Sequence, residues 1–72
     1  MMKVIGVRLR EYHSRRTFLL LVAARSITSA HLIASKFAEG KGVDADVKEA
    51  TDVGMTREQQ ERVLMHGGFD EE

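Results

Sequence analysis

The 72-residue sequence contains no cysteine, no proline and no tryptophan. Without cysteine the chain has neither a disulfide bond nor a thiolate metal site, which are two common ways of stabilising a very small domain. Without proline, no ring interrupts a helix or a central strand. The lack of cysteine also fits a reducing compartment, so we expect a cytoplasmic protein.

Long apolar runs are also missing. The longest, Phe18 to Ala24, has seven residues, whereas a membrane-spanning helix needs about 20. No N-terminal apolar segment with a small-residue cleavage site is present, so we expect no secretory signal and no membrane partner. A domain of this size buries only about 60% of its unfolded surface, and forming a dimer is one way to bury more.

Charges are numerous and unevenly distributed. Residues 1–41 hold eight basic and two acidic residues, a balance of 8 − 2 = +6, and residues 42–72 hold three and nine, a balance of 3 − 9 = −6. Such a division is typical of a nucleic-acid-binding surface or an acidic tail, or of two halves that face each other. We expect residues 1–72 to form a single small α+β domain with an acidic tail at about residues 69–72.

The first half of the chain predicts two strands and a helix. Residues 3–12 alternate between apolar and polar side chains, which indicates a half-buried strand. In residues 17–24 the apolar side chains fall at both odd and even positions, so both faces of a strand would be apolar. Central strands and buried helical segments share this pattern. Residues 26–39 predict a helix that Ser26 caps at its N-terminus and that two glycines end.

The second half predicts a third strand and a short terminal helix. Residues 47–53 have strand character with room for a bulge. Thr56 and Gln59 have the spacing of a helical capping box, in which each side chain bonds to a backbone amide of the other. Glu58 and Arg62 have the i,i+4 spacing of an ion pair on a helix.

Two known patterns compete for the helix. "VRL" at residues 7–9 and "ITSAHLI" at residues 27–33 resemble the strand and second helix of ribbon-helix-helix proteins, which are dimeric DNA-binding repressors. That resemblance implies a first helix through "SRRTFLLLVAAR", residues 14–25. Residues 18–24 lack the 3.6-residue period of a surface helix, which is a departure from the family pattern.

"VAARSITSAHLIASKF", residues 22–37, resembles the strand-to-helix joint of small β-β-α-β proteins. The pattern covers roughly residues 3–53 and is similar to small phage-encoded inhibitors, including anti-CRISPR proteins and the T7-type inhibitor of bacterial RNA polymerase. It implies a phage or mobile-element accessory protein that docks on and inhibits a host macromolecular complex. We favour this pattern and expect an α+β fold, a three-stranded antiparallel sheet (β-β-α-β) with one packed helix and a short C-terminal helix.

Residues with catalytic or metal-binding chemistry are scattered. The three histidines, His13, His31 and His66, fall in separate predicted elements and lack the i,i+4 spacing of a helical zinc site. Asp44 and Asp46 have oxygen ligands suited to a divalent cation, but a lone pair of aspartates is usually solvated. We therefore expect no enzyme, no catalytic residue, no metal and no cofactor.

Five residues are predicted to contact a protein partner. Leu19 and Leu21 lie on the strand parity opposite the predicted core, and Leu32 lies off the apolar stripe of the helix. Glu58 and Glu61 belong to the acidic part of the chain and would compete for a basic channel on the target. The partner would be a host protein, a protein–nucleic acid complex or a second copy of the chain.

An alternative function uses the basic residues of the first hairpin. Arg8, Arg10, Arg15 and Arg16 lie close to Tyr12 in sequence. Arginine beside an aromatic ring suits RNA, single-stranded nucleic acid or operator DNA through phosphate contacts and stacking. The competing explanation is a solvated strand face whose charges prevent aggregation.

Overall fold

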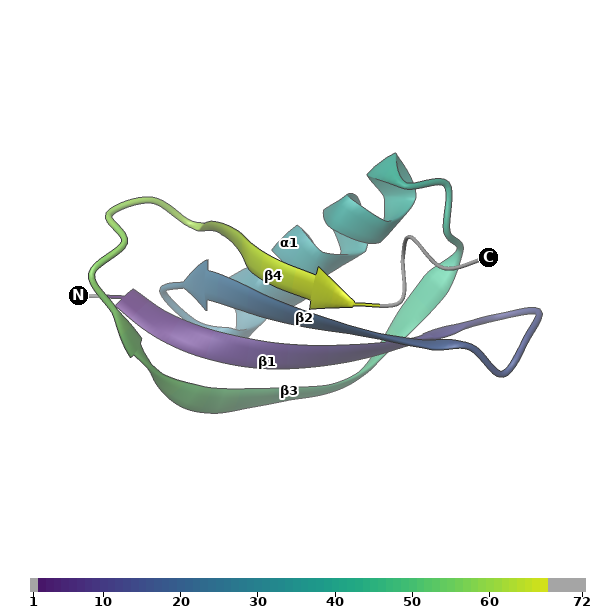
Figure 1. Cartoon of the computed structure of the whole chain (residues 1–72), viewed down its shortest axis with the longest axis horizontal. Helices are drawn as coiled ribbons and strands as arrows, with labels where there is room; N and C mark the ends of the chain where they lie inside the picture. The colour runs from purple at the N-terminus through teal and green to yellow at the C-terminus, as the bar shows by residue number, and fades with distance from the viewer. Residues whose placement is uncertain (1, 68–72) are drawn as a thin grey trace.

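Residues 2–67, the part that the computed structural model describes, form a four-stranded antiparallel sheet with one helix on one face (Figure 1). The elements follow in the order β1 (Met2–Glu11), β2 (Thr17–Ala24), α1 (Ile27–Gly40), β3 (Ala45–Thr56) and β4 (Arg62–Gly67). In space the strand order is β3-β1-β2-β4. The first hairpin is therefore the centre of the sheet, and the last two strands are its edges.

The core lies between the sheet and α1. Every second residue of β1 and β2 points to the same face, and these side chains are at most 2% exposed. They meet three alanines spaced four residues apart on the helix, whose small side chains let the helix approach the sheet closely. The buried set is Ile5, Val7, Leu9, Phe18, Leu20, Val22, Ala24, Ala30, Ala34 and Ala38.

The helix ends match the predicted signals. Ser26 is the N-cap, and its hydroxyl oxygen accepts a hydrogen bond from the backbone amide of Ser29 at 3.1 Å. At the other end Gly42 adopts a positive φ of 74°, the left-handed conformation that glycine reaches without strain. The backbone amide of Val43 then donates to the carbonyl of Ala38 at 2.9 Å. The predicted helix is confirmed.

The third strand is longer than predicted and contains irregularities. It extends over twelve residues, ten of which pair with β1, rather than over residues 47–53 alone. The register shifts opposite Arg8 and Leu9 and again opposite Val4 and Ile5, which confirms the expected bulged character. Each shift inserts one unpaired residue and turns the following side chains to the other face.

The predicted terminal helix is wrong, and so is the three-stranded sheet. The hydroxyl oxygen of Thr56 accepts a hydrogen bond from the amide of Glu58, two residues later, at 3.3 Å. This is a threonine turn, a local alternative to helix capping. Residues 62–67 form β4, which pairs with β2. Without β4, β2 would be an edge strand, and β4 satisfies the backbone groups along that edge.

The strand at residues 17–24 decides between the two fold patterns. It pairs with β1 from Arg10 opposite Thr17 to Lys3 opposite Ala24. The helix that a ribbon-helix-helix protein needs at this position is not formed, so that architecture is excluded for this chain. The acidic tail predicted at residues 69–72 lies outside the described residues.

Candidate functional site

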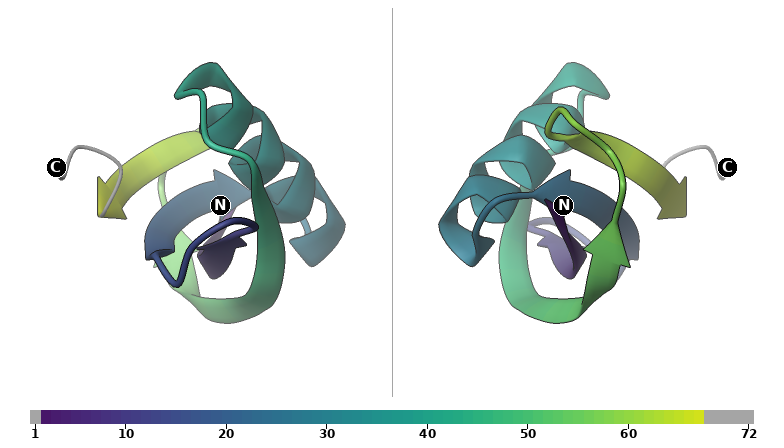
Figure 2. Two further views of the ribbon diagram at one scale, coloured as in Figure 1. Left: turned by 90° about the vertical axis from the view of Figure 1, so that its right-hand side faces the viewer. Right: turned by 90° about the vertical axis from the view of Figure 1, so that its left-hand side faces the viewer.

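The face of the sheet opposite α1 exposes several large apolar side chains around one hollow. We call it the open face and define its apolar part by Leu19, Leu21, Val53 and Met65. Leu19 is 61%, Val53 57% and Met65 63% exposed. Helix α1 lies on the other side of the sheet, and within residues 2–67 no element covers the middle of the open face (Figure 2).

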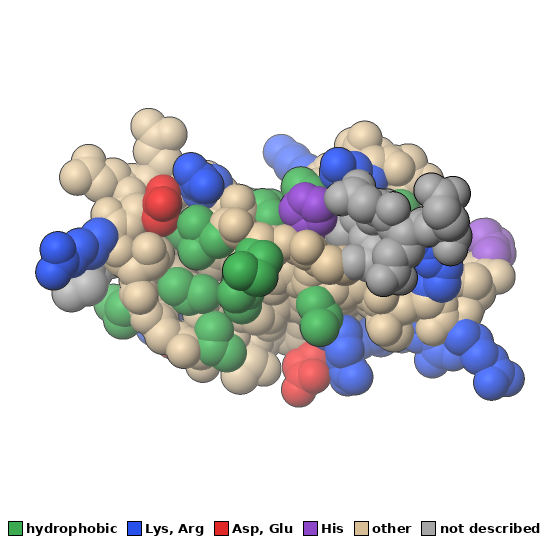
Figure 3. Space-filling model, in the orientation of Figure 1, with side chains coloured by type: hydrophobic (Ala, Val, Ile, Leu, Met, Phe, Trp, Pro, Cys, Tyr) green, Lys and Arg blue, Asp and Glu red, His purple; other side chains and the backbone are tan. Residues whose placement is uncertain are grey.

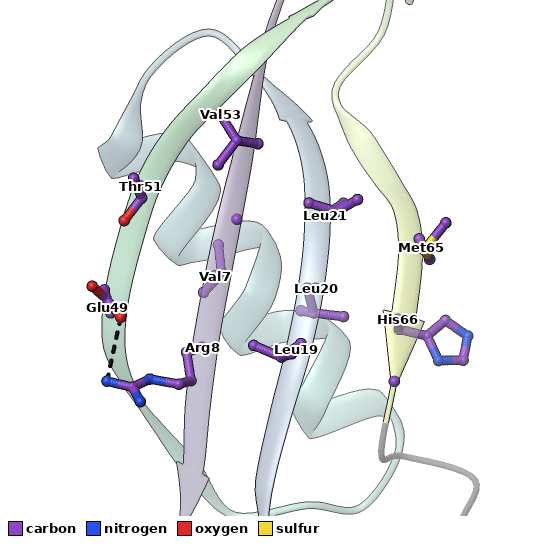
Figure 4. A pocket seen from close by; sticks show the side chains of 12 residues that line it. Val7, Arg8, Leu19, Leu20, Leu21, Glu49, Thr51, Val53, Met65 and His66 are labelled. Carbon is purple, nitrogen blue, oxygen red and sulfur yellow. Dashed lines mark ion pairs between the residues drawn. The ribbon is translucent and has the colours of Figure 1, made fainter.

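These side chains surround a shallow hollow of about 520 Å³ over β1 and β2. Figure 4 shows Leu19 and Leu21 projecting from β2 and Val53 leaning across β1. Gly6 lies beneath them, and a Cβ atom at Gly6 would be 3.6 Å from Val53 Cγ1 and 3.8 Å from Leu21 Cδ2. Because Gly6 has no side chain, the apolar hollow is deeper at this position.

Basic side chains occupy the hairpin end of the same face. A second hollow, which we call the basic hollow, has a volume of about 490 Å³. Its charged residues are Arg8, Arg10, Arg15 and Lys48. Arg8 also borders the apolar hollow, so the two hollows adjoin. Figure 3 shows apolar side chains over the middle of this view and Lys or Arg side chains toward the hairpin.

The charges on this face are only partly balanced. Arg8 pairs with Glu49 at 3.3 Å, and Lys48 pairs with Asp46 at 3.5 Å. No acidic side chain of residues 2–67 lies within ion-pair distance of Arg10. The same holds within these residues for Arg15. The open face therefore combines an apolar centre with excess positive charge at one end.

The predicted arginine cluster is brought together in part. Arg8, Arg10 and Arg15 share the basic hollow. Arg16 lies elsewhere, with its guanidinium 5.1 Å from the centre of the Phe18 ring. Because Phe18 belongs to the core under α1, this cation–π contact turns Arg16 toward the helix side.

The five predicted partner contacts separate into three groups. Leu19 and Leu21 lie on the open face. Leu32 is 60% exposed, but it belongs to α1 on the opposite side of the molecule. Glu58 lies 3.8 Å from Arg62, and Glu61 accepts a hydrogen bond from the backbone amide of Arg25 at 2.9 Å. Both glutamates therefore contribute contacts within the fold.

Three residues of the open face were not predicted from the sequence. Lys48 and Val53 are the two residues that the register shifts of β3 leave unpaired, and these shifts direct their side chains to the open face. The periodicity of the sequence does not reveal such shifts. Met65 reaches it because residues 62–67 form a strand, where a helix was expected. The apolar triplet at residues 63–65 was the available signal, but periodicity does not distinguish a strand from a helix in so short a run.

Metal-ligand groups and membrane-spanning helices were also sought among residues 2–67. Across residues 2–67, His, Asp and Glu side chains form no group of three that would hold a metal ion. No helix in this part of the chain has the length and apolar character needed to cross a membrane.

Comparison of the whole chain with protein-family models, with curated proteins and with solved structures gives no match. The resemblance of residues 3–53 to small phage inhibitors therefore stays a prediction.

Proposed function

We propose that this protein is a non-enzymatic binding protein that docks on a macromolecular partner through its open face. One observation carries the proposal: Leu19, Val53 and Met65 are each more than half exposed around a single hollow. Leaving three large apolar side chains in water sacrifices the stabilisation that their burial would provide. Contiguous apolar surface of this kind usually marks an interaction site.

We further propose that the partner is a host protein or a protein–nucleic acid complex, and that docking inhibits it in the cytoplasm. The support is that the strand-to-helix joint at residues 22–37 resembles that of small phage or mobile-element inhibitors. The fourth strand, β4, is not part of that β-β-α-β pattern. Binding without catalysis requires only a stable surface, and β1 and β2, which are paired on both sides, provide one.

The idea that the acidic residues occupy a basic channel has less support. Glu58 and Glu61 each have a partner inside the fold, at Arg62 and at the amide of Arg25. Replacing them with lysine would alter the connection between β3 and β4 as well as any interface. We therefore place the contact on the open face.

A position-specific crosslink tests this function. A photoreactive benzoyl-phenylalanine is placed at Leu19 in one variant and at Leu32 in another, and each is expressed in cells that naturally carry the chain. The two leucines have nearly equal exposure, 61% and 60%, on opposite sides of the molecule. We expect a covalent adduct of one defined mass from position 19 only.

Equal adducts from both positions, or adducts from position 32 alone, would contradict docking through the open face. Mass spectrometry of the adduct identifies the partner and shows whether it is a second copy of the chain. Circular dichroism of both variants checks that each retains its fold.

A second candidate function is nucleic-acid binding. The observation that favours it is the convergence of Arg8, Arg10, Arg15 and Lys48 on one hollow. Phosphate contacts release counterions, so affinity for single-stranded DNA or RNA should fall steeply with salt. The Arg10→Gln, Arg15→Gln double variant should bind more weakly and show a shallower salt slope. Salt-independent binding, or none at low salt, would reject this candidate.

A further inference from the structure

We infer that the occupant of the open face is an amphipathic helix of a partner protein, with an apolar stripe followed by a cluster of carboxylates. This inference rests on the proposed docking function and specifies the chemistry of the partner. Two adjoining features carry it, namely the apolar hollow over Gly6 and the uncompensated arginines next to it.

The apolar hollow suits a stripe of aliphatic side chains. Leu19, Leu21, Val53 and Met65 border it, and the absence of a side chain at Gly6 leaves a low floor between them. An apolar side chain placed over Gly6 would contact Leu21 and Val53 from above. Burying these surfaces is favourable in proportion to the apolar area removed from water.

The basic hollow favours a partner that has negatively charged groups beyond one end of that apolar stripe. Arg10 and Arg15 have no ion-pair partner within residues 2–67, and Arg8 and Lys48 have exposed ones. Charge complementarity across an interface mainly determines partner choice and association rate. A partner with carboxylates at this end is therefore selected over one with lysines.

The geometry of β1 determines the spacing. Gly6 and Arg10 lie four residues apart on the same side of the strand, which is about 13 Å at the usual rise of a strand. An α-helix rises about 1.5 Å per residue. In a helix that lies along β1 with its C-terminus toward the first hairpin, the carboxylates should therefore follow the central apolar residue by about nine positions.

A helix fits this site better than an extended segment. Extended peptides usually add to the edge of a sheet, where backbone groups are unpaired. The apolar hollow lies over β1 and β2, the two central strands, whose backbones are already paired on both sides. A helix buries an apolar stripe against such a face, as α1 does on the other side.

Two other occupants fit the face less well. The exposed apolar side chains are aliphatic or thioether groups, and bases need flat rings on which to stack. Among residues 2–67, Tyr12 is the one large aromatic side chain that is exposed. It lies in the hairpin turn and not over the apolar hollow. In a two-fold dimer of open faces whose axis runs along the strands, the two basic hollows would face each other, and their like charges would repel.

Two synthetic helical peptides of about 18 residues provide the probe, with leucines at positions i, i+3, i+4 and i+7. One carries three glutamates about nine residues beyond the central leucine, and the matched peptide carries lysines there. Fluorescence anisotropy with the full chain measures both affinities at low salt. We expect the glutamate peptide to bind tighter by on the order of tenfold.

Matched variants locate the bound peptide. Leu19→Asp should weaken binding of the glutamate peptide by on the order of tenfold, whereas Leu32→Asp should leave it unchanged. Arg10→Gln with Arg15→Gln should remove most of the preference for glutamate over lysine. NMR amide shifts should concentrate on Leu19, Leu21, Val53 and Met65.

Several outcomes would overturn the inference. Equal affinity for the two peptides, preference for lysine, or equal losses from Leu19→Asp and Leu32→Asp would each reject an acidic helix on this face. Binding of single-stranded DNA without binding of either peptide would assign the face to nucleic acid. A doubled molar mass that Leu19→Asp abolishes would assign it to a second copy.

The crosslinking experiment separates the two proposals. An adduct at position 19 without a glutamate preference means that docking holds and the occupant has different chemistry. No adduct at position 19 and no peptide binding means that the docking function itself is wrong.

Discussion

The two faces of the sheet contain similar residues but have different surroundings. Leu19 and Leu20 are neighbours on β2, yet Leu19 is 61% exposed and Leu20 only 2%. Leu20 packs under the alanines of α1, whereas Leu19 borders an open hollow. The difference teaches that one apolar strand can supply both the core that stabilises the fold and the surface available for a partner.

The sharpest test of this difference compares two identical substitutions on β2. Leu20→Ala should lower the free energy of unfolding by about 2–5 kcal/mol, because it leaves a cavity in the core. Leu19→Ala should change it by less than about 0.5 kcal/mol. Urea denaturation of both variants measures the two values. Similar losses would mean that the open face is covered within the protein.

Adding volume to each face should also give unequal effects. Ala34→Leu forces α1 away from the sheet and should cost about 1–3 kcal/mol in unfolding free energy. Gly6→Ala places a Cβ at ordinary contact distances of 3.6 and 3.8 Å from its neighbours. That variant should be within about 0.5 kcal/mol of wild type, or more stable. If Gly6→Ala lowered the free energy of unfolding in urea by much more than this, Val53 and Leu21 would have to lie closer to Gly6 than these distances.

The helix that covers one face depends on its cap. Ser26→Ala removes the acceptor of the Ser29 amide and should lower the free energy of unfolding by about 1 kcal/mol. Ser35→Ala is the control, since Ser35 lies exposed within α1, where alanine has the higher helix propensity. Thermal unfolding followed by circular dichroism compares them. An equal decrease in both variants would argue against the cap.

The smallest effect on stability should come from the ion pair on the open face. Glu49→Gln removes the 3.3 Å contact with Arg8, in which both side chains are more than half exposed. Exposed pairs contribute about 0–1 kcal/mol, so unfolding in urea should change little. The freed Arg8 should instead strengthen binding of the glutamate peptide in the anisotropy assay. Weaker binding would place the peptide's carboxylates elsewhere.

Much of the first half of the fold was predictable. Alternation in β1, the apolar run of β2 and the cap at Ser26 are local signals, and each element formed where expected. Leu19 and Leu21 were also placed on the face opposite the helix from parity alone. The prediction failed after Thr56, where a capping-box spacing produced a turn and the following strand paired with distant β2.

The amino-acid sequence by itself determined β1, the helix and the apolar residues of their shared core, because period-two alternation, a serine cap and spaced alanines act over a few residues. Only pairing with β1 decided that residues 17–24 are a strand, since their continuous apolar run also suits a buried helical segment. Only the tertiary structure decided that residues 62–67 are a strand and that Val53 and Met65 join Leu19 on the open face. A six-residue segment has weak local preference, and its state depends on the unpaired backbone of β2. Likewise, a bulge redirects Val53 only once β3 has paired with β1.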